Sequence, residues 1–195
     1  SIHLLLAQGP MAARQIVEKT GISQPTVSRA LAALGDEVVR VGSGSAIHYA
    51  LRDNARGFAS APVFRVSDEG MIRALGTLIP VRPDGFVMVQ ADGVTLHSDG
   101  LPWWLFDMRP QGYLGRAYAS AHAAGLGLPP NPEHWRDADV IRALLAHGHD
   151  AIGNLLIGER ARDRFIAMPA PVPVDRAASY PALARAAGAG ELPGS

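Results

Sequence analysis

The sequence predicts an α+β fold, in which a helical N-terminal unit with a β-hairpin is followed by a small antiparallel-sheet domain with packed helices. Three observations support this prediction. Apolar residues recur at helical spacing up to Leu34, the period changes to two from Val38 onward, and a second β-like region begins at Val63. With 48% hydrophobic residues in 195, the chain can bury the core that such a fold needs.

The first twenty residues contain two helix patterns separated by a break. Ile2–Leu6 is apolar and fits the end of a first helix, whose start we expect upstream of Ser1 because the sequence does not open with methionine. After Gly9, apolar positions recur at helical spacing over residues 13–20. Gly21 suits the left-handed turn that would end this second helix.

A third helix and a hairpin follow directly. We expect the Ser23 side chain to cap the helix and Pro25 to lie in its first turn. The apolar positions of one helix face are Val27, Ala30, Leu31 and Leu34. Residues 38–41 and 47–51 then alternate in polarity around a glycine- and serine-rich turn at 42–45. A helix-turn-helix followed at once by a hairpin is the layout of a winged helix, which we assign to residues 1–55.

Polar side chains near the start of the third helix are candidate DNA contacts. In a helix-turn-helix the second helix of the motif enters the major groove, where Gln pairs with adenine and Arg with guanine or phosphate. The hairpin residues Arg40 and His48 can reach phosphate or the neighbouring minor groove. The predicted DNA-binding residues are Ser23, Gln24, Thr26, Ser28, Arg29, Arg40 and His48.

The alternative is that these helices form a packing unit whose polar face is simply solvated. Residues 1–55 carry five basic and four acidic side chains, which counts against tight nonspecific binding. We prefer DNA binding, because the turn, the capping residue, the polar start of the third helix and the hairpin are all features of a DNA-binding winged helix.

The rest of the chain divides into a linker, a second domain and a connector. We expect a linker at 56–62 and an α+β domain at 63–168. Its expected strands are 63–66, 71–81, 85–90, 94–97, 153–158 and 164–167, with a type I′ turn at Asp92-Gly93, and its expected helices are 113–124 and 137–147. Residues 169–195, rich in proline, alanine and glycine, are expected to form a connector, with one helical turn near 180–187.

Composition excludes several classes of site. The absence of cysteine excludes disulfides, thiolate nucleophiles and cysteine-ligated zinc. No apolar run is long enough to span a bilayer and the start lacks a signal-peptide pattern, so we expect a cytoplasmic protein without membrane partners. Because the net charge is zero, DNA contacts must come from local placement of charge. Lys19 is the single lysine, which matters because phosphate-transferring enzymes usually place a lysine on the nucleotide.

Two longer segments carry a resemblance to a known family. Residues 21–31, GISQPTVSRAL, resemble the recognition-helix region of many bacterial transcription regulators. Residues 101–116, LPWWLFDMRPQGYLGR, and 148–158, GHDAIGNLLIG, look like the N-terminal part of HipA-family serine/threonine kinase toxins, in the YjjJ-like branch that carries its own helix-turn-helix. The order of these parts along nearly the whole chain makes the resemblance specific.

This resemblance implies ATP-dependent protein phosphorylation by a kinase core that lies beyond the chain. Residues 191–195 look like the approach to the family's glycine-rich phosphate loop, so the loop, the nucleotide lysine, the catalytic aspartate and the metal-binding acid are not here. We therefore expect no catalytic residue and no cofactor in this chain, with ATP and Mg²⁺ needed only by a full-length kinase. Alone, the chain should be inactive as a kinase.

Other chemistry-bearing residues have simpler explanations. His147 and His149 could suggest a metal pair, but histidines favoured at a helix end are expected. Ser43, Ser45 and His48 lack an orienting acid, so a hairpin explains them better than a hydrolase.

Bulky and basic residues of the second domain also have two interpretations. Trp103, Trp104, Phe106 and Tyr113 form either an exposed partner-binding patch or the domain core, and we expect core. Arg109 and Arg116 could bind phosphate, but an ion pair with Asp107 is the expected role for one of them.

Three functional hypotheses follow. In the first, the winged helix binds double-stranded DNA at an operator, as a homodimer, while the second domain docks on a kinase core or another partner. In the second, the chain is the front end of a HipA-like kinase toxin. In the third, it is a free-standing antitoxin-like protein that binds a kinase in trans.

Overall fold

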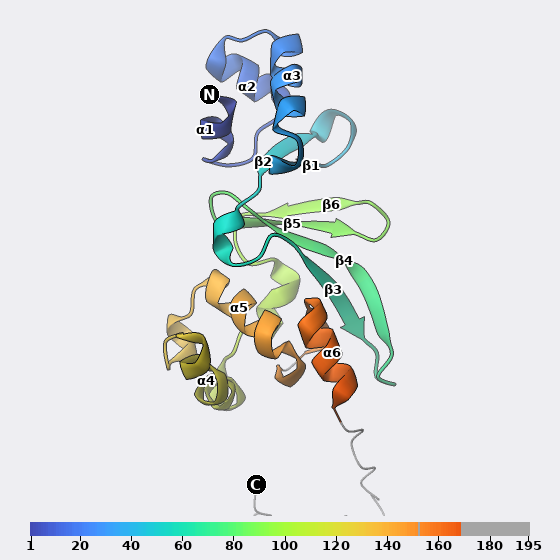
Figure 1. Ribbon diagram of the computed structural model, residues 1–195, viewed down its shortest axis with the longest axis vertical. Helices are drawn as coiled ribbons and strands as arrows, with labels where there is room; N and C mark the ends of the chain where they lie inside the picture. The colour runs from blue at the N-terminus through green and yellow to red at the C-terminus, as the bar shows by residue number, and fades with distance from the viewer. Residues whose placement is uncertain (152, 169–195) are drawn as a thin grey trace, which may run out of the picture.

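The computed structural model describes residues 1–151 and 153–168, without the side chains of Phe106 and Asp107. A winged helix-turn-helix stands at one end, an antiparallel sheet lies in the middle, and helices α4, α5 and α6 lie toward the other end (Figure 1). The predicted α+β fold is confirmed. The predicted connector at 169–195 lies outside the described residues.

The N-terminal unit is held together by apolar residues at helical spacing. Helices α1 (Ile2–Leu6), α2 (Ala13–Thr20) and α3 (Gln24–Leu34) share a buried cluster that also includes Leu51. Strands β1 (Val38–Val41) and β2 (His48–Leu51) form the antiparallel hairpin that the period-two pattern predicts. Met11 adds a short bridge to Tyr49, so the hairpin is tied to the helices.

The second sheet has five antiparallel strands in the order β6-β5-β4-β3-β7. Their bounds are Ala61–Val66 for β3, Ile72–Val81 for β4, Gly85–Gln90 for β5, Thr95–Ser98 for β6 and Leu155–Ile157 for β7.

The turn between β5 and β6 differs from the predicted type I′. That turn needs positive φ at both central residues, whereas in the described chain only glycines have positive φ, including Gly93 at 89°. The Gly93 N–H donates to the Gln90 oxygen, and the Gln90 N–H donates to the Val94 oxygen. The loop is therefore one residue longer than predicted, with Gly93 alone in the left-handed region.

Both faces of the sheet are buried along β5 and the second half of β4. Leu78, Phe86 and Met88 pack into the main core with residues of α4 and α5. On the opposite face, Ile79, Val81 and Val87 pack against the hairpin residues Val39, Val41 and Ala50. Burial on both sides explains why β4 and β5 are nearly continuous apolar runs.

Three helices complete the second domain: α4 (Gly112–Leu126), α5 (Asp137–His147) and α6 (Glu159–Ala167). The predicted strand at 164–167 is wrong, because these residues are the end of α6. Gly158, at φ 89°, ends the extended segment, and the apolar positions Ala161 and Phe165 are then one helical turn apart and pack on Phe64. A run of four residues is too short to show this spacing.

The segment predicted as a linker is part of the packed structure. Ala61 and Pro62 already belong to β3, and the Arg56 side chain is 11% exposed. Arg56 pairs with Asp53 and donates to the backbone oxygens of Gly85 and Val81. The winged helix and the second domain are thus joined by hydrogen bonds and apolar contact. Within the described ranges, no helix has both the length and the apolarity to cross a membrane.

Candidate nucleic-acid interface

The turn between α2 and α3 is built by three successive local bonds. Helix α2 ends at Gly21, whose φ of 69° favours glycine and whose N–H donates to the Val17 oxygen at 2.8 Å. The Thr20 hydroxyl donates to the Ile16 oxygen at 2.6 Å and accepts from the Ile22 N–H at 3.3 Å. This turn fixes the direction in which α3 leaves.

Ser23 occupies the N-cap position of α3, but its side chain does not cap the helix. Its hydroxyl instead lies 3.0 Å from the Thr26 hydroxyl. Thr26 also accepts a hydrogen bond from Arg29 Nη2 at 3.4 Å, and Arg29 Nε donates to the Pro25 oxygen at 3.4 Å. The predicted capping bond is replaced by a polar row along the first two turns.

The outward face of α3 is polar, exposed and free of acidic residues. Val27 and Leu31 are buried against α1 and α2, which turns Gln24, Thr26, Ser28 and Arg29 toward solvent. The N-terminal end of this eleven-residue helix carries partial positive charge, although Pro25 has no N–H and the Thr26 N–H donates to the Ser23 oxygen at 3.0 Å. The structure therefore brings five of the predicted residues together on a surface suited to phosphate and base edges.

A groove separates α3 from the hairpin. It has a volume of about 290 Å³ and is lined by Ser28 and Leu31 from α3 and by Arg40 and Tyr49 from the hairpin. Arg40 is exposed and forms no ion pair within the described residues. Arg40 thus shares a surface with α3, as expected. Tyr49 was not predicted, although its pairing opposite Arg40 follows from the hairpin register.

His48 lies apart from the other predicted contacts. It pairs with Val41, which faces the second domain, whereas Arg40 pairs with Tyr49 on the opposite face of the hairpin. Consistent with this placement, burial lowers the pKa of His97 on β6, Asp99 opposes the shift, and the nearby His48 adds to it. His48 therefore belongs to the seam between hairpin and sheet.

The wing itself is fastened to the second domain. The Gly42 N–H at its tip donates to the Thr95 hydroxyl of β6 at 2.6 Å, and the Asp53 N–H donates to the Pro80 oxygen at 2.9 Å. Together with the apolar seam, these bonds fix the hairpin as a support for α3.

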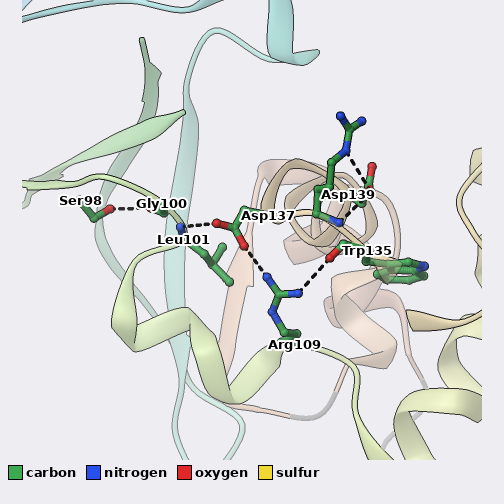
Figure 2. Close-up of polar contacts among 8 residues, drawn as sticks. Ser98, Gly100, Leu101, Arg109, Trp135, Asp137 and Asp139 are labelled. Carbon is green, nitrogen blue, oxygen red and sulfur yellow. Dashed lines mark hydrogen bonds and ion pairs between the residues drawn. The ribbon is translucent and has the colours of Figure 1, made fainter. Parts of the chain in front are cut away.

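Arg109 is a structural residue, and Asp137 is its ion-pair partner among the described side chains, whereas the predicted partner Asp107 has a side chain that lies outside them. Figure 2 shows its guanidinium between Asp137 at the start of α5 and the backbone oxygen of Trp135, the latter at 3.0 Å. Asp137 also accepts from the Leu101 N–H at 2.9 Å. Arg116 is exposed on α4.

The histidines near the end of α5 form a packed cluster. The His122 and His147 rings stack with centroids 3.9 Å apart, and Arg164 Nη1 lies 3.1 Å from His147 Nδ1. The guanidinium thus occupies the Nδ1 side of His147. No group of three potential metal ligands occurs among the described residues.

The expectation that the aromatic residues form the core is wrong for two of the three whose side chains the structure describes, and Phe106 lies outside those side chains. Trp103 is 77% exposed and Tyr113 is 75% exposed, whereas Trp104 is partly buried against the core. Leu114, next to Tyr113, is 59% exposed. Along α4 this surface continues into a groove of about 460 Å³ lined by Leu114, Tyr118 and His122, among others. Some small residues of α4 are buried and Tyr118 and Leu126 pack partly against the core, whereas Tyr113 and Leu114 in its first turn face outward.

Comparison with known proteins matches both units. Residues 2–37 match the family described as bacterial regulatory proteins of the arsR family, and residues 58–166 match the family described as the YjjJ-like toxin, middle domain. The chain is 40% identical to the toxin YjjJ of Escherichia coli (strain K12) over an alignment that covers 98% of this chain and 44% of that protein. No solved structure matches the chain.

Proposed function

Because the chain belongs to the family of YjjJ-like toxins and carries a helix-turn-helix DNA-binding domain, we propose that it is the part of such a toxin that recognises a specific DNA sequence. The observation that carries this proposal is the outward face of α3, which is polar, exposed and without acidic residues. The alternative is a polar face that is merely solvated, and the variants below distinguish it from a DNA-binding face.

In this proposal α3 lies in the major groove. Gln24 pairs with adenine, and Arg29 binds guanine or a phosphate. The hydroxyl groups of Ser23, Thr26 and Ser28 donate hydrogen bonds to the phosphates of the DNA backbone. Arg40 contacts a phosphate across the groove between α3 and the hairpin. Two copies of the chain would bind two half-sites of the DNA. Because the DNA is chromosomal in this proposal, the protein would act in the cytoplasm.

The test is a fluorescence anisotropy titration of the 195-residue chain with duplex from upstream of its own gene and with a scrambled duplex, at two salt concentrations. The upstream duplex should bind more tightly, and salt should weaken both complexes. Gln24→Ala combined with Arg29→Ala should weaken specific binding about 30-fold or more, because each bidentate base contact contributes about 1–3 kcal/mol.

Arg73→Ala is the matched control, since Arg73 is an exposed arginine on β4 of the second domain. It should leave the preference for the upstream duplex intact. Equal binding of both duplexes, or a double variant that binds like the wild type, would rule out recognition by α3.

The second domain offers a docking surface for the rest of the toxin. The chain spans less than half the length of its relative, and Tyr113 and Leu114 leave apolar surface exposed at the 460 Å³ groove. In this proposal the remaining portion covers that surface and carries the kinase chemistry with ATP and Mg²⁺. Lys19, the single lysine, lies exposed near the end of α2, far along the chain from this surface.

Hydrogen exchange tests the docking surface. The backbone of α4 should exchange more slowly in a full-length toxin than in the 195-residue chain, whereas the β5–β6 hairpin should be unchanged. Equal exchange of α4 in both proteins would contradict docking at this surface.

A further inference from the structure

A further cavity lies where the winged helix meets the second domain. Its volume is about 370 Å³, and its polar lining consists of His3, Glu37, Arg52, Asn54 and Arg82. His3 comes from α1, Arg52 follows β2, and Arg82 follows β4, so both units contribute to the wall.

The backbone holds the two arginines in fixed positions. The Arg52 N–H donates to the Glu37 oxygen and the Arg82 N–H donates to the Leu51 oxygen, each at 2.8 Å. Arg52 also forms a β-bridge with Val81. The backbone atoms of both arginines are therefore fixed where the two strands meet.

Neither guanidinium has an acidic partner in the described part of the chain. The ion pairs and side-chain hydrogen bonds found there include neither Arg52 nor Arg82, and Arg52 Nε is buried without any partner. An unsatisfied buried donor on a charged group costs free energy, and such groups are normally paired. The neighbouring Arg56 shows the contrast, because its three nitrogens bond to Asp53, Gly85 and Val81.

The geometry points to a binding site for the phosphate group of a small molecule in this cavity, and we propose it as such. Guanidinium groups bind phosphate through paired N–H donors, and the cavity wall contains two of them together with the Asn54 side chain. The volume exceeds the roughly 30 Å³ of a single water many times over, so an organic group attached to the phosphate also fits. Glu37 is the single acid in the lining, so the cavity has a net positive charge.

Such a ligand would link the two units. Arg52 belongs to the winged helix and Arg82 to the second domain. A phosphate bound by both arginines would therefore fix the position of the winged helix, and with it α3, relative to the second domain. This inference stands independently of DNA recognition, because it rests on the cavity alone.

The experiment is a thermal unfolding titration of the 195-residue chain with inorganic phosphate at pH 7.5, against sodium chloride at equal ionic strength. Phosphate at about ten times its dissociation constant should raise the Tm by about 3–6 °C, since only the folded state offers the site. Arg82→Gln, on an exposed residue, should abolish this rise, and Arg52→Lys should weaken it because an ammonium lacks the paired donors. Arg73→Gln, which removes one positive charge elsewhere, should keep the full rise.

A rise that sodium chloride reproduces, or that survives in Arg82→Gln, would overturn the proposal. A separate titration with duplex in phosphate-free buffer distinguishes the source of the phosphate. Unchanged duplex affinity in Arg82→Gln supports a small-molecule site. A lower duplex affinity in Arg82→Gln, together with no phosphate-induced Tm shift in the wild type, would assign the cavity to the DNA backbone and overturn the proposal as well.

Discussion

Replacing Asp53 by asparagine tests whether the junction between the two units is held by a buried ion pair. The Asp53 and Arg56 side chains are each 11% exposed, with Nε 3.0 Å from Oδ2, and the carboxylate also accepts the Ala55 N–H at 3.1 Å. Asparagine keeps the size and the acceptor but removes the charge. The Arg56 cation then stays buried against the Phe86 ring, 4.9 Å from its centroid, without a counter-charge.

The expected loss can be estimated from these contacts. Removing one partner of a buried ion pair costs about 3–5 kcal/mol. Arg56 keeps the backbone oxygens of Gly85 and Val81, so we expect about 2–4 kcal/mol. For a chain of this length the Tm should fall by about 4–16 °C in a circular dichroism melt, and urea unfolding should give the same ranking.

The control is Glu18→Gln, which breaks the Arg14–Glu18 pair on the surface of α2. Those side chains are 86% and 66% exposed with a separation of 3.6 Å, so the free energy of unfolding should change by no more than about 0.5 kcal/mol. If the Tm of Asp53→Asn equals that of Glu18→Gln within experimental error, the buried ion pair does not stabilise the junction and the reasoning is refuted.

Two further predictions concern the second domain. Burial, and then the neighbouring His122 and Arg164, lower the pKa of His147 below its ordinary value of 6.5, so the unfolded state takes up the proton more readily and stability is lost as the pH falls below about 6.5. His147→Gln should therefore show a smaller fall in Tm from pH 7.5 to 5.5 than the wild type, and an equal fall would exclude His147 as the cause. Gly76→Ala should lower the Tm, because a Cβ at Gly76 would collide with the backbone of β5. Gly125→Ala, in open space on α4, should raise stability by about 0.4–1 kcal/mol, and two changes of the same sign would contradict this account.

Elements with a clear local pattern could be predicted from the sequence. Helix α5 begins and ends where predicted, with Asp137 and Asp139 in its first turn and His147 in its last, as the helix dipole favours. The helix-turn-helix likewise follows from Gly21 between two amphipathic segments. In both cases the signal lies within a few residues of the structure that it predicts.

The candidate site was predictable only in part. Five of its residues lie on the first turns of α3, where helical spacing alone exposes them. His48 could have been separated from Arg40 by counting the hairpin register, since partners across two strands share a face. Arg52 and Arg82 had no such signal, because they meet only through the packing of two distant strands.

The sequence by itself determined the kinds of element, their order and the polar face of α3, because periodicity and turn residues act between neighbours along the chain. Only the tertiary structure decided which surfaces those elements cover. It placed the hairpin on the sheet, paired Arg109 with Asp137 and left Trp103 exposed. These outcomes depend on contacts between residues far apart in sequence, where the shapes of whole elements, and not local spacing, determine what becomes buried.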